Sequence, residues 1–196
     1  MLSAWKFLQQ EFSEELRSPE QHPVGGLSCR EKGEKHMEDQ TTEKTGAGKL
    51  SDRAAGMLVK AALEARKNAY CPYSGFAVGA ALLCADGSVW CGCNIENAAF
   101  TPGNCAERTA FFKAVSDGKH EFSAIAIVGG KADAEKLEFC PPCGVCRQVM
   151  REFCRNNFRI ILAVSEKEYQ VFTLGELLPL SFGPEQLGGD PDTCVK

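Results

Sequence analysis

The sequence contains neither a long apolar run nor a stretch typical of a secretory signal. No segment approaches the roughly 18 consecutive apolar residues that a membrane-spanning helix needs. Residues 1–17 lack the basic start and the apolar run of a signal peptide, and Glu11, Glu14 and Glu15 are unlike the acid-poor composition of an organelle transit peptide. From these absences we expect a cytosolic, cytoplasmic protein with no membrane partner.

A basic stripe is also missing. The 196 residues include 22 Lys and Arg against 26 Asp and Glu, which gives a formal net charge of −4 and a pI near 5.5. Proteins that bind polynucleotides usually cluster basic side chains on one face. We therefore expect a small-molecule substrate and no nucleic-acid partner. The length suits one ordinary domain with an added tail.

Cysteine, by contrast, is abundant, with 11 residues. In a reducing cytosol, thiols bind metals more often than they form a disulfide framework, and the odd number agrees with that interpretation. Most thiols outside the two motifs described below are expected to be small apolar fillers or incidental thiols. These are Cys29, Cys71, Cys84, Cys154 and Cys194.

Composition divides the chain into three parts. Residues 1–49 form an extension that begins with apolar residues at helical spacing, which indicates a short amphipathic helix, either a tail or a partner-docking helix. Residues 18–49 hold few apolar side chains and are expected to be disordered. The folded domain is predicted over residues 50–187, and residues 188–196 are expected to form a flexible tail.

Helices and strands alternate along the folded part. A helix capped by Ser51 is followed by predicted strands over 76–84 and 88–93, a helix over 105–116, a strand over 122–128, a helix over 144–154, strands over 159–164 and 169–173, and a short helix over 174–178. Five strands, some of them joined as hairpins, predict a mixed sheet flanked by helices, which is an α/β fold.

Two cysteine motifs indicate a metal site: Cys105-Ala106-Glu107-Arg108 and Pro142-Cys143-Gly144-Val145-Cys146. Three thiols can hold one zinc ion and leave its fourth position open, as catalytic zinc sites do. Each motif begins a predicted helix, where the helix dipole favours thiolates. Because side chains two residues apart in a regular helix diverge by about 200°, Cys105 and Glu107 can share a site only if Cys105 is the helix cap.

Arg108 follows the candidate acid directly. Zinc with three thiolates carries a formal charge of −1, and an arginine that donates to the sulfurs would offset this charge. Arg147 is a weaker candidate for the same role. The alternative interpretation of Arg108 is a solvated surface residue.

The cysteines allow other arrangements as well. Cys91 and Cys93 could join Cys143 and Cys146 in a closed structural zinc site, although this would leave Glu107 without a role. Cys140 could replace one member of the trio. A redox Cys-x-x-Cys pair is a further alternative, but no thioredoxin-like βαβ start precedes it.

Several separated segments resemble the small, homotetrameric zinc cytidine deaminases. They are residues 70–74 (YCPYS), 93–98 (CNIENA), 105–110 (CAERTA) and 142–148 (PCGVCRQ), within a resemblance that runs from about Ser51 to Leu187. The resemblance implies a three-layer sandwich with a five-stranded mixed sheet. It also implies hydrolytic deamination of cytidine or deoxycytidine to uridine or deoxyuridine plus ammonia, a step of pyrimidine salvage, with one Zn²⁺ per subunit.

The same resemblance implies roles for individual residues. Cys105, Cys143 and Cys146 match the zinc ligands, and Glu107 matches the proton shuttle for a zinc-bound hydroxide that attacks C4. The substrate-binding matches are Asn94 and Glu96 for the ribose hydroxyls, Phe76 for the base ring, the backbone around Ala106 for the base edge, and Ala98, Phe100 and Phe182 for contacts to the site of an adjacent subunit.

Some of these residues have a simpler structural interpretation, and others depart from the family pattern. Asn94 and Glu96 could be loop polar residues, and Phe76 could be a core residue. Phe100 stands where many relatives carry tyrosine, and Gly75 where a larger residue is common. Two rival functions are a deaminase that edits polynucleotides and a non-enzymatic zinc module.

Overall fold

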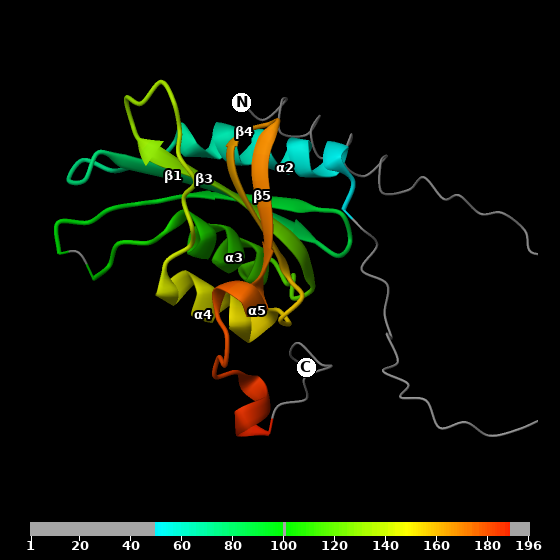
Figure 1. The fold of residues 1–196 in the computed structure, drawn as a ribbon. Coiled ribbons are helices and arrows are strands. Elements are labelled where there is room, and N and C mark those ends of the chain that lie inside the picture. The colour runs from blue at the N-terminus through cyan, green and yellow to red at the C-terminus, as the bar shows by residue number, and fades with distance from the viewer. Residues whose placement is uncertain (1–49, 100, 189–196) are drawn as a thin grey trace, which may run out of the picture.

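A five-stranded mixed sheet separates two helical layers in the computed structural model (Figure 1). The structure describes residues 50–99 and 101–188, so the predicted N-terminal helix, the remainder of the extension and the C-terminal tail lie outside the described residues. The strand order is β2-β1-β3-β4-β5; β3 and β4 are parallel and the other neighbours are antiparallel. The strands are β1 (Phe76–Cys84), β2 (Val89–Cys93), β3 (Phe122–Lys131), β4 (Arg159–Ser165) and β5 (Glu168–Thr173). The predicted α/β class and mixed sheet are confirmed.

Helix α2 (Asp52–Arg66) covers one face of the sheet. It begins at the predicted cap, where the Ala54 amide donates to Ser51 Oγ over 3.1 Å. Leu58 and Val59 are fully buried against the strands, together with small alanines of the same face. Among the described residues, no helix combines the length and apolar content needed to cross a bilayer.

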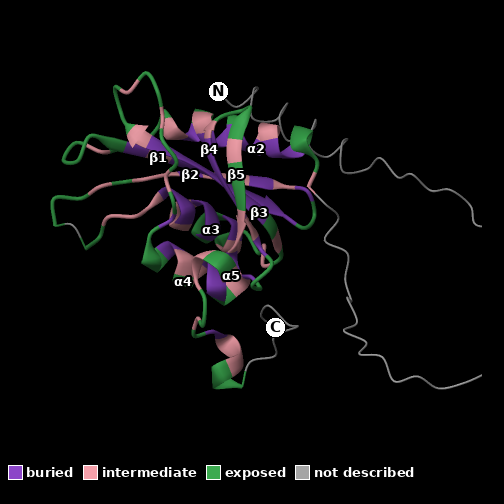
Figure 2. Cartoon of the chain, viewed as in Figure 1, coloured by how far each residue is buried: buried purple, intermediate pink, exposed green. Residues whose placement is uncertain are grey.

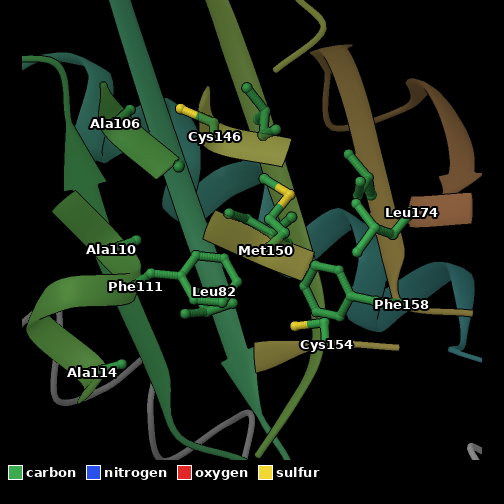
Figure 3. Close-up of a cluster of buried hydrophobic side chains, with 14 of the residues drawn as sticks. Leu82, Ala106, Ala110, Phe111, Ala114, Cys146, Met150, Cys154, Phe158 and Leu174 are labelled. Carbon is green, nitrogen blue, oxygen red and sulfur yellow. The ribbon is translucent and has the colours of Figure 1, made fainter. Parts of the chain in front are cut away.

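Helices α3 (Ala106–Ser116), α4 (Gly144–Phe153) and α5 (Leu174–Leu177) lie on the opposite face (Figure 1). Their core contains Phe111, Met150 and Leu174, which are fully buried (Figure 3). Cys146 belongs to the same cluster and is also fully buried. One of the candidate zinc ligands is therefore fixed by the packing of the domain core. In Figure 2 the buried positions lie mainly on the strands and on the helix surfaces that face them.

Element boundaries differ from the prediction at a few places. Strand β3 continues to Lys131 rather than Val128, because it pairs with β1 along its whole length, as far as the pair Phe76 and Lys131. Strand β2 begins at Val89, one residue later than expected. A 3-10 helix, η1 (Pro184–Leu187), was not predicted, because four residues carry no periodic signal.

Gly79 allows α2 to pack closely on β1. A Cβ there would lie 2.5 Å from the Arg66 nitrogen and 2.9 Å from its Cα, which are backbone atoms that cannot move aside cheaply. We expect Gly79→Ala to lower the free energy of unfolding by about 1–3 kcal/mol, as overpacked cores do.

The matched control is Gly56→Ala, in the helix of the same interface. Its added Cβ would meet only the Glu166 carbonyl, at 3.5 Å, so the gain in helix propensity should raise stability by about 0.5–1 kcal/mol. Urea denaturation of both variants measures the difference. Equal stabilities would contradict the close-packing argument.

Candidate active site

Cys105 lies at the junction between a loop and helix α3. It is the N-cap residue, with extended backbone angles of φ −78° and ψ 156°, as the spacing of the motif predicted. Glu107 then falls in the first turn of the helix, and its side chain is only 4% exposed. The non-helical cap thus lets two residues that would diverge within a regular helix share one site.

Helix α4 repeats this arrangement. Cys143 is its N-cap, also extended, and its sulfur accepts from the Cys146 amide over 3.5 Å. The sulfurs of the two cap residues lie close together, so the N-termini of α3 and α4 meet at one place. Each helix end adds partial positive charge and N–H groups without a partner in the helix. Such surroundings stabilise thiolates.

The three sulfur atoms form a compact cluster. Those of Cys105, Cys143 and Cys146 all lie within 4.8 Å of one another. The separations are 3.9 Å between Cys105 and Cys143 and 3.5 Å between Cys143 and Cys146. Tetrahedral zinc with bonds of about 2.3 Å places its sulfur ligands about 3.8 Å apart. The donor set and its spacing therefore fit one zinc ion.

The closed four-cysteine site is not formed. The sulfur of Cys91 faces the Ala61 carbonyl at 3.7 Å, and that of Cys93 faces the Asn68 carbonyl at 3.3 Å. Cys91 thus contacts α2 and Cys93 contacts the turn that follows it, and neither belongs to the cluster of possible metal ligands found among the described residues. Cys140 lies outside that cluster too, and burial raises the pKa of its thiol to about 11.

The side chains of the site affect one another's pKa values through hydrogen bonds and charge. Hydrogen bonding from the Cys146 thiol lowers the pKa of Cys105 to about 5, and Arg108 adds to this effect. The same interaction and burial raise the pKa of Cys146. Burial raises the pKa of Glu107 to about 7, with a further contribution from the Cys105 charge. A carboxylic acid with such a pKa can both accept and donate a proton near neutral pH.

Arg108 contacts the cluster rather than only solvent. Its Nη2 lies 3.7 Å from Cys105 Sγ and 3.4 Å from the Gly103 carbonyl oxygen. The guanidinium is therefore close enough to Cys105 to offset thiolate charge, as the sequence predicts. Arg147 has a different partner, because it donates to the Leu177 carbonyl.

A cavity of about 500 Å³ opens beside the cluster. Cys105 and Arg108 form part of its wall, together with Asn94 and Glu96, which the sequence had singled out for substrate binding. The remaining lining residues are Tyr73, Ser74, Ile95, Asn97, Gly103 and Asn104. The structure thus brings two separated motifs, residues 93–98 and 105–110, to one pocket.

Backbone contacts orient Asn94 and Glu96. The Glu96 carboxylate accepts from the amides of Tyr73 (2.9 Å) and Ser74 (3.2 Å), and hydrogen bonds from Ser74 and Tyr73 lower its pKa. The Asn94 side chain accepts from the Val78 amide and donates to the Phe76 carbonyl. Both side chains keep unused hydrogen-bonding capacity, and both residues line the cavity.

Tyr73 and Ser74 are the residues that sequence reasoning missed. Their segment, residues 70–74, was part of the resemblance, but no role followed from it. Tyr73 and Ser74 hold Glu96 through main-chain amides, which any residue type supplies. The position of the segment in the fold, and not its residue types, therefore decides this contact.

Other predicted site residues do not line this pocket. Phe76 is the first residue of β1, and its ring lies toward Gly129, where an added Cβ would be 3.3 Å from Phe76 Cε1. Ala106 is fully buried, Ala98 is exposed in its loop, and Phe182 is exposed far along the chain. Phe100 lies outside the described residues.

Comparison with known families decides the affiliation. Residues 53–162 match the sequence model of the cytidine and deoxycytidylate deaminase zinc-binding region. The chain belongs to this family. The match includes both cysteine motifs, and the three-sulfur cluster is accordingly the family's zinc-binding site.

Individual relatives support the same family assignment. A cytidine deaminase of Sporosarcina psychrophila is 49% identical over 130 residues, which cover 66% of this chain and 92% of that protein. One from Halalkalibacterium halodurans is 50% identical over 131 residues (67% and 96%). The crystal structure of the Burkholderia pseudomallei cytidine deaminase is 46% identical and superposes with a TM-score of 0.58, over 64% of this chain and 96% of that one.

Zinc content tests the ligand set of this deaminase. We expect the purified chain to carry about one zinc ion and Cys143→Ser to lose most of it, because two thiolates hold zinc far more weakly than three. Elemental analysis measures the content. Cys93→Ser is the matched control and should keep its zinc. If both variants retained the metal, Cys143 would not be a ligand.

Proposed function

We propose that this chain is a zinc-dependent cytidine deaminase that converts cytidine or deoxycytidine and water into uridine or deoxyuridine and ammonia. The observation that carries the proposal is that Cys105 belongs to two sites at once. This residue belongs to the sulfur cluster and to the wall of the cavity that holds Glu96. A molecule bound in that cavity would therefore lie against the metal site.

Each site residue has a task in this reaction. Zinc, when bound by the three cysteines, acts as a Lewis acid and makes a water molecule a better nucleophile near neutral pH. Glu107 takes a proton from the water and delivers it to N3 of the pyrimidine, which makes C4 electrophilic. After the oxygen has added to C4, Glu107 takes the proton that remains on this oxygen and transfers it to the amine. The C4–N bond then breaks, ammonia leaves and the C4 carbonyl of the uracil ring forms.

The environment of Glu107 suits both proton transfers. Its burial and the neighbouring thiolate charge raise its pKa to about 7, so that neither protonation state is strongly favoured. Arg108 lies against Cys105 and reduces the negative charge of the cluster, which would otherwise oppose the deprotonation of water.

The ribose side of the pocket selects a free nucleoside. We propose that Glu96, fixed by two amides, accepts from the 3′-hydroxyl with its remaining lone pairs, and that Asn94 contacts the sugar beside it. A polynucleotide carries a phosphate at that oxygen. The anionic Glu96 would repel such a phosphate, which argues against a polynucleotide-editing enzyme.

We further propose a homotetramer in which Ala98, Phe100 and Phe182 complete the site of an adjacent subunit, with Phe76 packing on the base and the Ala106 backbone reading its edge. The exposure of Phe182 and Leu180 in one chain supports such an assembly. Residues 50–187 would be sufficient for catalysis. A reducing cytosol would keep the thiols available for zinc.

The role of Glu107 is tested by Glu107→Gln. This isosteric change removes the proton carrier and leaves the sulfur cluster intact, so kcat should fall by about 10²–10⁴-fold, as for a lost general acid-base group. Ammonia release and zinc content are measured on the same sample. Glu135→Gln, in an exposed loop, is the control and should be fully active. Full activity of Glu107→Gln with zinc bound would refute the mechanism.

Substrate class is tested by a direct comparison. Ammonia release from cytidine should be readily detected, whereas a single-stranded oligonucleotide with internal cytosines should give none, because its 3′-phosphates meet Glu96. Activity on the oligonucleotide alone would replace nucleoside deamination by polynucleotide editing. No activity on either substrate by the zinc-loaded protein would favour a non-enzymatic zinc module.

A further inference from the structure

The segment between α5 and η1 displays apolar side chains to solvent. Leu180 is 106% exposed and Phe182 is 58% exposed. Together with η1 the segment lies beyond α4 and α5, on the side away from the sheet (Figure 1). Leu180 also has a φ of 51°, in the left-handed region that leucine rarely adopts. An exposed and unusual conformation of this kind needs contacts that hold it in place.

Helix α4 provides those contacts. Arg151 is only 9% exposed; its Nε donates to Ser181 Oγ over 2.9 Å and its Nη2 forms an ion pair with Glu185. One turn earlier, Gln148 Nε2 donates to the Phe182 carbonyl over 3.0 Å. The residues on both sides of Phe182 are therefore tied to the helix that carries Cys143 and Cys146.

Gly183 fits against the arginine. A Cβ at this position would lie 2.7 Å from Glu185 Oε2 and would also collide with the Arg151 guanidinium. The Gly183 amide in turn donates to Gln186 Oε1. The backbone that presents the Phe182 ring is thus held on several sides, although Phe182 is not among the described residues that pack against the core beneath α3 and α4.

We infer that Arg151, with Glu185, Ser181 and Gln148, is a positioning device that fixes Phe182 for the active site of a neighbouring subunit. We call these four residues the clamp. The inference rests on the proposed homotetramer. Phe182 is not among the residues that line the cavity of its own chain, so the backbone held by the clamp would present the exposed ring to a contact outside that chain. Arg151 acts through Phe182 and is not itself a catalytic residue.

The first test is Arg151→Met, which keeps the apolar stem of the side chain and removes both polar contacts. Of the clamp contacts to α4, only the one from Gln148 then remains, so Phe182 should be less well positioned for nucleoside in the neighbouring site. We expect KM for cytidine to rise by about tenfold, as for a lost apolar contact in a pocket, while kcat changes little, because no reacting group is altered. Glu152→Gln, the exposed next residue of α4, is the control and should match wild type.

The second test separates an effect on the neighbouring site from one on the same chain. Tagged Arg151→Met chains are co-expressed with an excess of untagged Glu107→Gln chains, and mixed oligomers are purified by the tag. Every site that still contains Glu107 then belongs to an Arg151→Met chain. In most cases the neighbouring subunit that supplies Phe182 is a Glu107→Gln chain, whose clamp is intact. KM should return close to the wild-type value.

The outcomes are distinct. An unchanged KM in Arg151→Met, or a mixed oligomer that keeps the raised KM, overturns the inference. If Arg151→Met does not fold, Glu185→Gln breaks the same ion pair at a more exposed position and replaces it in both tests. Light scattering that shows active monomers also overturns the inference. Wild-type protein that contains zinc but releases no ammonia would instead refute the proposed function.

Discussion

The site depends on one constraint: two helices must begin at the same place on one face of the sheet. Cys105 and Cys143 are N-caps of α3 and α4, and their sulfurs lie 3.9 Å apart. The convergence places the partial positive charge of two helix ends beside the three thiols, which favours the thiolate form that binds zinc. The same caps place Glu107 and Cys146 in the first turn of their helices.

Close packing holds these helices in position. A Cβ at Gly92 of β2 would lie 2.5 Å from the Ala110 nitrogen, so only glycine lets α3 approach the strand. Cys146 lies in the core that Met150 and Phe111 fill (Figure 3). Rigid packing of this kind costs conformational freedom once, on folding, and leaves the site preorganised for binding a metal and a substrate.

Local patterns predicted much of the fold and of the site. Among the described residues, local patterns indicated the five strands and the helices from α2 to α5, and the motif spacing predicted Cys105 as a cap. The end of β3 at Lys131 and the existence of η1 were not predicted, because cross-strand pairing and four-residue turns leave no periodic signal. The amides of Tyr73 and Ser74 were missed for a similar reason, since main-chain donors are independent of residue type.

The sequence by itself determined the chemistry: three thiols, an acid two residues after the first of them, and an arginine beside that acid. Side-chain identity fixes what a group can bind or protonate, so these assignments follow from residue types and short spacings. Only the tertiary structure decided which thiols meet. Cys91 and Cys93 face the α2 layer and Cys146 faces the core, because β-sheet alternation and helix packing set the direction of each side chain. Distances across the sheet are set by packing, and no local pattern encodes them.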